Sequence, residues 1–327
     1  MDASLPREYG DIHTAVVALV DRLAPVVPVA HQPSLAREIA AAIGRMSSSM
    51  GESMALRQSI IRGGTATRDQ IVDGLAAWVT VIFDLANLQQ DRRRALDLEA
   101  RLPDEALARL TGAVSRSRNG CILAVPHIGS VEMFVAVLKD RGIDIGFVYT
   151  IGADPTPTER WIYAGRRATL GTPVAFGRRN TGCEIAKLLR KGGVVGMVVD
   201  VYPSARYRGI PVRIHDSVFA YPPGPARFAR SGTLVLPGFA SVRDADGFSM
   251  DILDPIDATG DFTQNLADRI GAFTAARPEA YWLWHPIPND PFLAAAQRDR
   301  PDLLKAAPAT LANDEAVAVA IEALKPA

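Results

Sequence analysis

Cysteine is scarce in this sequence. The chain has only Cys121 and Cys183 among its 327 residues, too few for a disulfide framework. Both cysteines lie in apolar segments, and neither belongs to a cluster with metal-ligand spacing, so we expect no bound metal. This composition is typical of a protein that works in the reducing cytoplasm.

An excess of charge and a long apolar run are also missing. Lysine and arginine total 36, as do aspartate and glutamate, so net charge predicts no nucleic-acid partner. The longest apolar stretch, 75–88, is interrupted by Thr80, Asp84 and Asn87 and is shorter than the roughly 20 residues of a membrane span. The amino terminus lacks the basic start of a signal peptide. We expect a cytoplasmic protein, either free or in peripheral contact with the inner face of the cell membrane.

The chain contains enough apolar residues, 48% of the total, to bury a large core. Before residue 118 the hydrophobic spacing predicts mainly helices, including one that opens with a Thr67-to-Gln70 capping box. From residue 120 strands and helices alternate, which predicts a mostly parallel α/β sheet. We therefore predict a helical N-terminal subdomain over 1–118, an α/β core over 119–290 and a helical tail over 291–327. The expected strands are 121–125, 145–149, 173–176, 194–199, 233–242 and 248–253.

Segment 121–132 combines an apolar strand with two chemically active side chains. The strand leads through Pro126 to His127, and Ser130 is the expected N-cap of a helix whose first turn contains Glu132. A histidine is the usual general base near neutral pH, and a carboxylate can orient it. In one continuous helix the two side chains would point about 140° apart, so the pair requires His127 to precede the helix. Ligands of open α/β sheets bind at such strand ends.

Four segments together resemble the lysophospholipid acyltransferase superfamily, in the branch of bacterial lipid A late acyltransferases and phosphatidylinositol mannoside acyltransferases. The resemblance covers residues 118–288. Its segments are the His-x4-Glu motif from His127 to Glu132, the apolar strand that ends in aspartate at 191–200, the Gly-Pro-Ala-Arg segment within 221–232, and the Pro-Glu-x-x-Trp-Leu-Trp tail at 277–284.

The resemblance implies a glycerol-3-phosphate acyltransferase-like α/β fold and acyl transfer to a hydroxyl or amine. It implies His127 as base, Glu132 as its partner, and acyl carrier protein or coenzyme A thioester as co-substrate, with no bound cofactor or metal. Backbone N–H groups near Gly129 and Ser130, or around Gly224, are expected to stabilise the oxyanion. Asp200 is expected to contact the substrate, although a role as a cap at the end of its strand explains it equally well. Arg206 and Arg208 are expected to contact a phosphopantetheine or a carrier protein, unless they are only solvated.

The sequence also departs from the family. Arginines that commonly follow the second strand are missing from 148–155, and the usual Asp-Gln-Asp is replaced by Asp200-Val-Tyr202. A fixed guanidinium is the usual partner of a phosphate group. Family members also commonly begin with a membrane-anchoring helix, which we do not expect in this chain. These differences favour a small-molecule or carrier-bound acceptor over a phosphorylated glycolipid, although a lipid acceptor stays open.

Two other functions remain open from the sequence: a thioesterase, in which water replaces the acceptor, and a catalytically silent acyl- or lipid-binding protein. A covalent acyl-enzyme is not expected, because no Gly-x-Ser-x-Gly elbow is present and Cys121 lies inside a strand. A group of arginines at Arg166, Arg167, Arg178 and Arg179 is explained equally by solvation and by contact with an acidic carrier protein.

Overall fold

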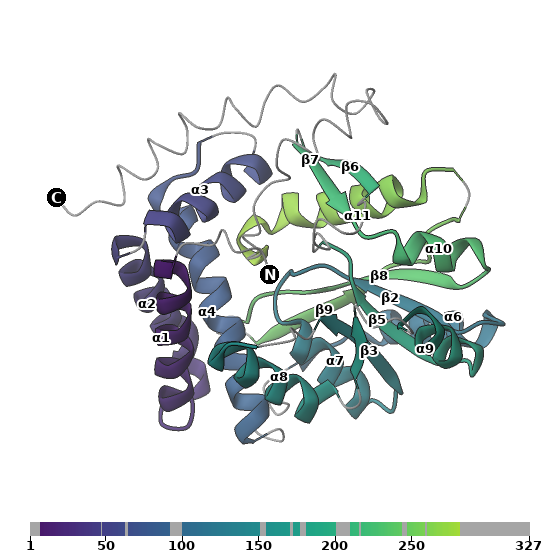
Figure 1. Ribbon diagram of the computed structural model, residues 1–327, viewed down its shortest axis with the longest axis horizontal. Helices are drawn as coiled ribbons and strands as arrows, with labels where there is room; N and C mark the ends of the chain where they lie inside the picture. The colour runs from purple at the N-terminus through teal and green to yellow at the C-terminus, as the bar shows by residue number, and fades with distance from the viewer. Residues whose placement is uncertain are drawn as a thin grey trace.

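The computed structural model describes residues 7–46, 48–62, 65–91, 100–150, 155–170, 173–176, 181–200, 210–215, 217–243, 247–258 and 260–281. The predicted C-terminal tail, 291–327, and the tryptophans of the 277–284 segment lie outside these residues. Figure 1 shows helices gathered at one end of the molecule and a sheet with its own helices at the other.

The N-terminal helices pack around one long apolar helix. They are α1 (Arg7–Leu23), the short η1 (Val29–His31), α2 (Gln32–Met46), α3 (Ser48–Arg62) and α4 (Arg68–Gln90). The capping box at the start of α4 is confirmed: the Thr67 hydroxyl accepts from the Gln70 N–H, and the Gln70 side chain accepts from the Thr67 N–H. The face of α4 predicted to be core, which includes Trp78, is buried in this cluster.

The opposite side of α4 is buried as well. Three apolar residues on this side, Val81, Phe83 and Leu85, are at most 4% exposed. Among the helices in the described parts of the chain, only α4 is long and apolar enough to cross a membrane. However, 89% of its most apolar segment is buried inside the protein. The helix also contacts α7 (Val131–Asp140) and α8 (Pro157–Leu170), two helices of the α/β part, and so packs the N-terminal helices against that part.

The predicted α/β fold is confirmed. Seven strands form one sheet in the order β1-β9-β8-β2-β5-β3-β4, and every neighbouring pair is parallel except β8 and β9. The strands are β1 (Ala100–Arg101), β2 (Cys121–Val125), β3 (Ile145–Thr150), β4 (Pro173–Phe176), β5 (Val194–Val198), β8 (Leu234–Ala240) and β9 (Phe248–Ile252). All but β1 were predicted to within a few residues, because each is an apolar run between turn signals.

Helices cover both faces of the sheet. Alternate residues of β2 point to opposite faces of the sheet and belong to two separate hydrophobic cores. Ile122 and Ala124 pack with residues of α9 (Thr181–Arg190), α10 (Gly224–Arg230) and α11 (Phe262–Ala276). Cys121, Leu123 and Val125 pack on the other side with residues of α6 (Asp104–Arg116), α7 (Val131–Asp140) and α8 (Pro157–Leu170). In Figure 1 α11 lies above the sheet and α7 and α8 lie below it. The predicted helical subdomain ends at residue 118 and so includes α6, yet α6 packs in the hydrophobic core beside the sheet. The division of the chain into three parts stays a prediction.

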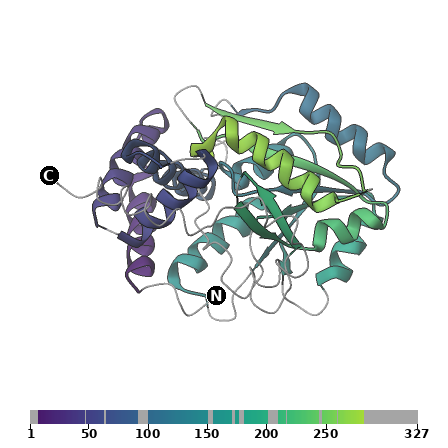
Figure 2. The ribbon, with the colours of Figure 1, turned by 90° about the horizontal axis from the view of Figure 1, so that it is seen from above.

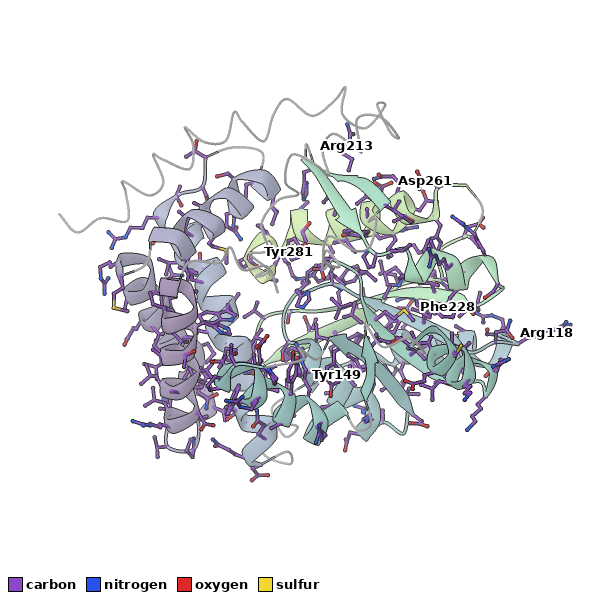
Figure 3. All side chains as sticks on the ribbon, in the orientation of Figure 1. Arg118, Tyr149, Arg213, Phe228, Asp261 and Tyr281 are labelled. Atoms are coloured by element: carbon purple, nitrogen blue, oxygen red, sulfur yellow. The ribbon has the colours of Figure 1, made fainter. Side chains whose placement is uncertain are left out.

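A two-stranded hairpin was not predicted from the sequence. It consists of β6 (Ile210–Ile214) and β7 (Ser217–Tyr221), which are antiparallel, and it packs on α11, which crosses the molecule in Figure 2. The Gln264 side chain both donates to the Arg213 carbonyl and accepts from the Arg213 N–H. After α11 the short η2 (Pro278–Ala280) returns the chain toward α3 and α4, and Figure 3 shows the following Tyr281 near these helices.

Candidate active site

The carboxyl ends of β2 and β5 bring a histidine and an aspartate together. The two strands are parallel neighbours whose register pairs Val125 with Val198. His127 and Asp200 each lie two residues beyond this last pair. Because parallel strands in register end at the same edge, the two side chains meet there.

Asp200 holds His127 through both of its carboxylate oxygens. Oδ1 lies 2.8 Å from the His127 Nδ1, and Oδ2 accepts the His127 backbone N–H at 2.7 Å. The Asp200 side chain is fully buried, and that of His127 is 11% exposed. An ionised carboxylate only accepts hydrogen bonds, so Nδ1 of the neutral imidazole carries the proton and Nε2 carries the lone pair. This is the tautomer that a general base needs.

The carboxylate that bonds to the imidazole differs from the expected one. Sequence analysis gave this role to Glu132, but the Nδ1 partner in the structure is Asp200. Glu132 Oε1 instead accepts a hydrogen bond from Arg166 Nε at 2.7 Å. The cause is geometric: His127 precedes α7 as required, but Glu132 is in the first turn of that helix and meets α8, whereas Asp200 continues the adjacent strand.

Glu132 and Arg166 form a buried ion pair beside the histidine. The side chains are 5% and 22% exposed. Burial acts to raise the pKa of Glu132, but Arg166, the Glu132 N–H and the charge of His127 together lower this pKa below its ordinary value. Glu132 therefore carries a negative charge close enough to stabilise a protonated His127 electrostatically.

The turn between His127 and α7 is held by segments far away in the sequence. Gly129 adopts a left-handed φ of 59°, and its N–H donates to the Ala280 carbonyl at 2.9 Å. Ile128 forms an isolated antiparallel bridge with Tyr281. Ser130 is the predicted N-cap, since its hydroxyl accepts from the Met133 N–H at 3.4 Å. The Gly129 N–H, already bonded to a carbonyl, is therefore a poor candidate for the expected oxyanion donor.

The family model for bacterial lipid A biosynthesis acyltransferases matches residues 66–287. The chain belongs to this family. Comparison with individual curated proteins finds no significant match. The matched region runs from the start of α4 past η2 and includes His127, Glu132 and Asp200, so the acyltransferase family covers the whole site described above. The broad prediction of an acyltransferase from the four sequence segments is confirmed.

Other residues expected at the acyltransferase site are spread more widely. Gly224 opens α10, which packs against α11 and β8; an oxyanion role for it stays a prediction. Arg206 and Arg208 lie outside the described residues, as do Arg178 and Arg179. Arg166, expected to be solvated or to face a carrier protein, is instead the partner of Glu132.

Cys121 is unsuited to act as the acyltransferase nucleophile. It lies at the start of β2, away from the edge at which β2 leads to His127, and it is fully buried. Burial raises the pKa of its thiol to about 11, so almost no reactive thiolate exists at neutral pH. This agrees with the expectation that no acyl-enzyme forms at this residue. Within the described ranges no three His, Cys, Asp or Glu residues are grouped to hold a metal ion.

Sequence reasoning missed the role of Asp200 in orienting His127. The residue was noticed at the end of an apolar strand, but its partner depends on which strand lies next to β2. A usable signal was present: both residues follow five-residue apolar strands after the same two-residue spacing. Tyr281 and Ala280, which hold the turn from the far end of the described chain, gave no local signal of this contact.

Proposed function

We propose that this acyltransferase moves an acyl group from an acyl carrier protein or coenzyme A thioester to a hydroxyl or amine, with His127 as general base and Asp200 as its orienting partner. The observation that carries the proposal is the pair of hydrogen bonds from His127 to Asp200, at 2.7 and 2.8 Å, at the carboxyl edge of the sheet. They support an imidazole held in one orientation and in the tautomer that a general base needs.

The proposed reaction is a direct displacement. Nε2 of His127 takes the proton of the acceptor O–H or N–H while that oxygen or nitrogen attacks the thioester carbonyl. The resulting imidazolium is stabilised by Asp200 and by the nearby charge of Glu132. When the tetrahedral intermediate collapses, the C–S bond breaks and the imidazolium gives its proton to the departing thiolate. The products are an acylated acceptor, a free thiol and neutral His127.

Donors for the oxyanion remain part of the proposal. Ser130 N–H lies at the start of α7, where helix geometry leaves amide groups without intrahelical acceptors. The Gly129 N–H, by contrast, is already bonded to the Ala280 carbonyl. Ser130 N–H is therefore a better candidate than Gly129 N–H to stabilise the negative oxygen of the tetrahedral intermediate.

For the acceptor we propose a soluble metabolite or a carrier-bound intermediate. The support is the sequence of 148–155, which contains no arginine where family members commonly carry one. The segment itself supplies no guanidinium fork for a phosphorylated glycolipid. Arg166, whose guanidinium lies 5.8 Å from the centre of the Tyr149 ring, is already paired with Glu132.

The proposal is tested by measuring thiol release from a panel of acyl carrier protein and coenzyme A thioesters, with and without mixed alcohol and amine acceptors. His127→Ala should reduce turnover by about a hundredfold or more, the usual effect of removing a general base. The matched control is His31→Ala, since His31 is exposed on η1, and it should keep wild-type turnover.

Each other outcome has a distinct meaning. Turnover by His127→Ala at the wild-type rate would reject the mechanism. Thiol release that no acceptor accelerates would favour a thioesterase. Tight thioester binding without turnover, unchanged in His127→Ala, would favour a binding protein.

A further inference from the structure

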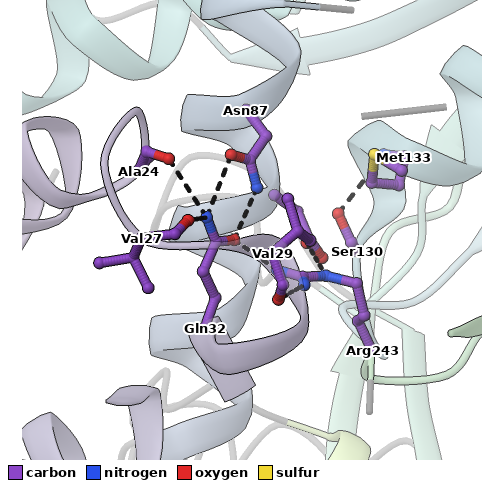
Figure 4. A network of polar contacts seen from close by, with 9 residues as sticks. Ala24, Val27, Val29, Gln32, Asn87, Ser130, Met133 and Arg243 are labelled. Carbon is purple, nitrogen blue, oxygen red and sulfur yellow. Dashed lines mark hydrogen bonds and ion pairs between the residues drawn. The ribbon is translucent and has the colours of Figure 1, made fainter. Parts of the chain in front are cut away.

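Arg243 is a buried cation where the sheet meets the N-terminal helices. It lies three residues after β8, and its side chain is 2% exposed. Its Nε donates to Asp84 Oδ1 at 2.7 Å. One terminal nitrogen donates to the Val29 carbonyl at 2.8 Å and the other to Gln32 Oε1 at 2.9 Å, as Figure 4 shows. Every nitrogen of the guanidinium thus binds a group from the N-terminal helices.

Asp84, on α4, links this cation to the candidate active site. Its side chain is 1% exposed. Burial raises the pKa of Asp84, and the charge of Glu132 adds to this, whereas Arg243 and the nearby Ser130 hydroxyl act to lower that pKa. Asp84 Oδ2 has no hydrogen-bond partner in the described part of the chain. Asp84 therefore faces both Arg243 and the first turn of α7.

Ser130 is the residue of the turn on which Asp84 acts electrostatically. It is fully buried, and its oxygen already accepts the Met133 N–H as the N-cap; Figure 4 shows Ser130 close to Met133. A hydroxyl has one proton to donate. The Ser130 hydroxyl also lies close enough to Asp84 to act on the pKa of its carboxyl, and Ser130 is three residues after His127.

The segment that carries Arg243 reaches the same turn by a second route. A Cβ added to Gly129 would lie 2.2 Å from the Ser241 carbonyl oxygen and 2.4 Å from that of Ala240. Gly129 is thus packed directly on the end of β8. Movement of residues 240–243 would press on the backbone that holds His127, because close-packed interiors transmit such shifts.

We propose that Asp84, held by Arg243, is a positioning residue that fixes the turn from His127 to Ser130 and so sets the orientation of the His127 imidazole. The inference rests on the proposed role of His127. Buried ion pairs often add little net stability compared with apolar side chains, and several of them serve to select one arrangement of the chain. Here the arrangement selected is that of the catalytic turn.

The test compares Asp84→Asn with Asn87→Ala. Asparagine keeps the shape of Asp84 and an acceptor for Arg243, but it removes the negative charge that holds Arg243 and acts on Ser130. The control removes two hydrogen bonds on the far side of the same network: Asn87 Nδ2 donates to Gln32 Oε1 at 2.8 Å, and Gln32 Nε2 donates to Asn87 Oδ1 at 3.3 Å. Both variants should lower Tm, so stability alone does not separate them.

Two readouts separate positioning from structural support. The first is the ¹⁵N spectrum of the His127 ring nitrogens in the full-length protein without substrate, assigned by its loss in His127→Ala. The second is kcat and KM for the thioester, measured below Tm. Asp84→Asn should shift the His127 ring signals and lower kcat at least about tenfold, with KM within about threefold of wild type. Asn87→Ala should leave the ring signals and kcat unchanged.

Unchanged His127 signals and kcat in folded Asp84→Asn would overturn the inference. If Asp84→Asn does not fold, Ser130→Ala replaces it, because it removes the hydroxyl while keeping the ion pair, and the ring signals should shift in the same direction. Should His127→Ala remain active, the proposed function fails, and the ring spectra still decide whether Asp84 positions the turn.

Discussion

The two edges of the sheet use charged residues in opposite ways. At the carboxyl edge His127, Asp200 and Glu132 are at most 9% exposed, and each has a charged or titratable partner. At the amino edge, exposed cations precede the parallel strands: Arg116, Arg118, Arg141, Arg190, Lys191 and Arg230. Figure 3 shows Arg118 at the end of the molecule farthest from the N-terminal helices. In the described parts of the chain these cations have no ion-pair partner within 4.0 Å.

Burial explains the difference. Water screens the amino-edge cations, and several of them end helices, where they complement the helix dipole at small energetic gain. At the carboxyl edge desolvation makes each charge depend on its partner, since an unpaired buried charge is costly. A substitution that removes a charge should therefore change turnover or the free energy of unfolding strongly at the carboxyl edge and weakly at the amino edge.

The largest effect after loss of His127 itself is expected for Asp200→Asn. The amide keeps most of the shape but can present an NH₂ group to Nδ1, which favours the wrong imidazole tautomer. Turnover should fall about a hundredfold or more, with the fold retained. The measurement is single-turnover thiol release together with circular dichroism; a folded variant with near-normal turnover would show that Asp200 is only a strand cap.

An intermediate effect, on stability and its pH dependence, is expected for Glu132→Gln. Breaking a buried ion pair costs about 3–5 kcal/mol, and partial exposure of Arg166 favours the lower end. Because the folded-state pKa of Glu132 is lowered, its contribution is present above the unfolded pKa and is lost as pH falls through the folded pKa. Urea unfolding at pH 7 and at pH 3 should show a larger gap between wild type and variant at pH 7. An equal gap at both values would contradict the ion-pair account.

The smallest effect is expected for Arg230→Gln, at the amino edge. Arg230 ends α10 and is exposed, so the free energy of unfolding should change by about 0.5 kcal/mol or less. Turnover should equal that of wild type in the same thiol-release assay. A loss of stability comparable to that of Glu132→Gln would remove the contrast between the edges.

Local features were predictable from the sequence, and the partners of the site residues were not. The N-cap Ser130, the capping box at Thr67 and the end of β2 before His127 each depend on a few neighbouring residues. The bond from Asp200 to His127 depends on β5 lying beside β2, which no local pattern encodes. In the same way, the spacing of Glu132 in α7 does not reveal that α8 places Arg166 against it.

Long-range closure of the catalytic turn also affects when the site forms during synthesis. About 150 residues separate Gly129 from Ala280, the carbonyl to which its N–H is bonded. At roughly 5–20 residues per second, a ribosome needs about 8–30 s to make the intervening chain. The nascent acyltransferase therefore carries its histidine for that interval without the backbone contact that closes the turn. The complete site first forms after all seven strands of the sheet have been synthesised.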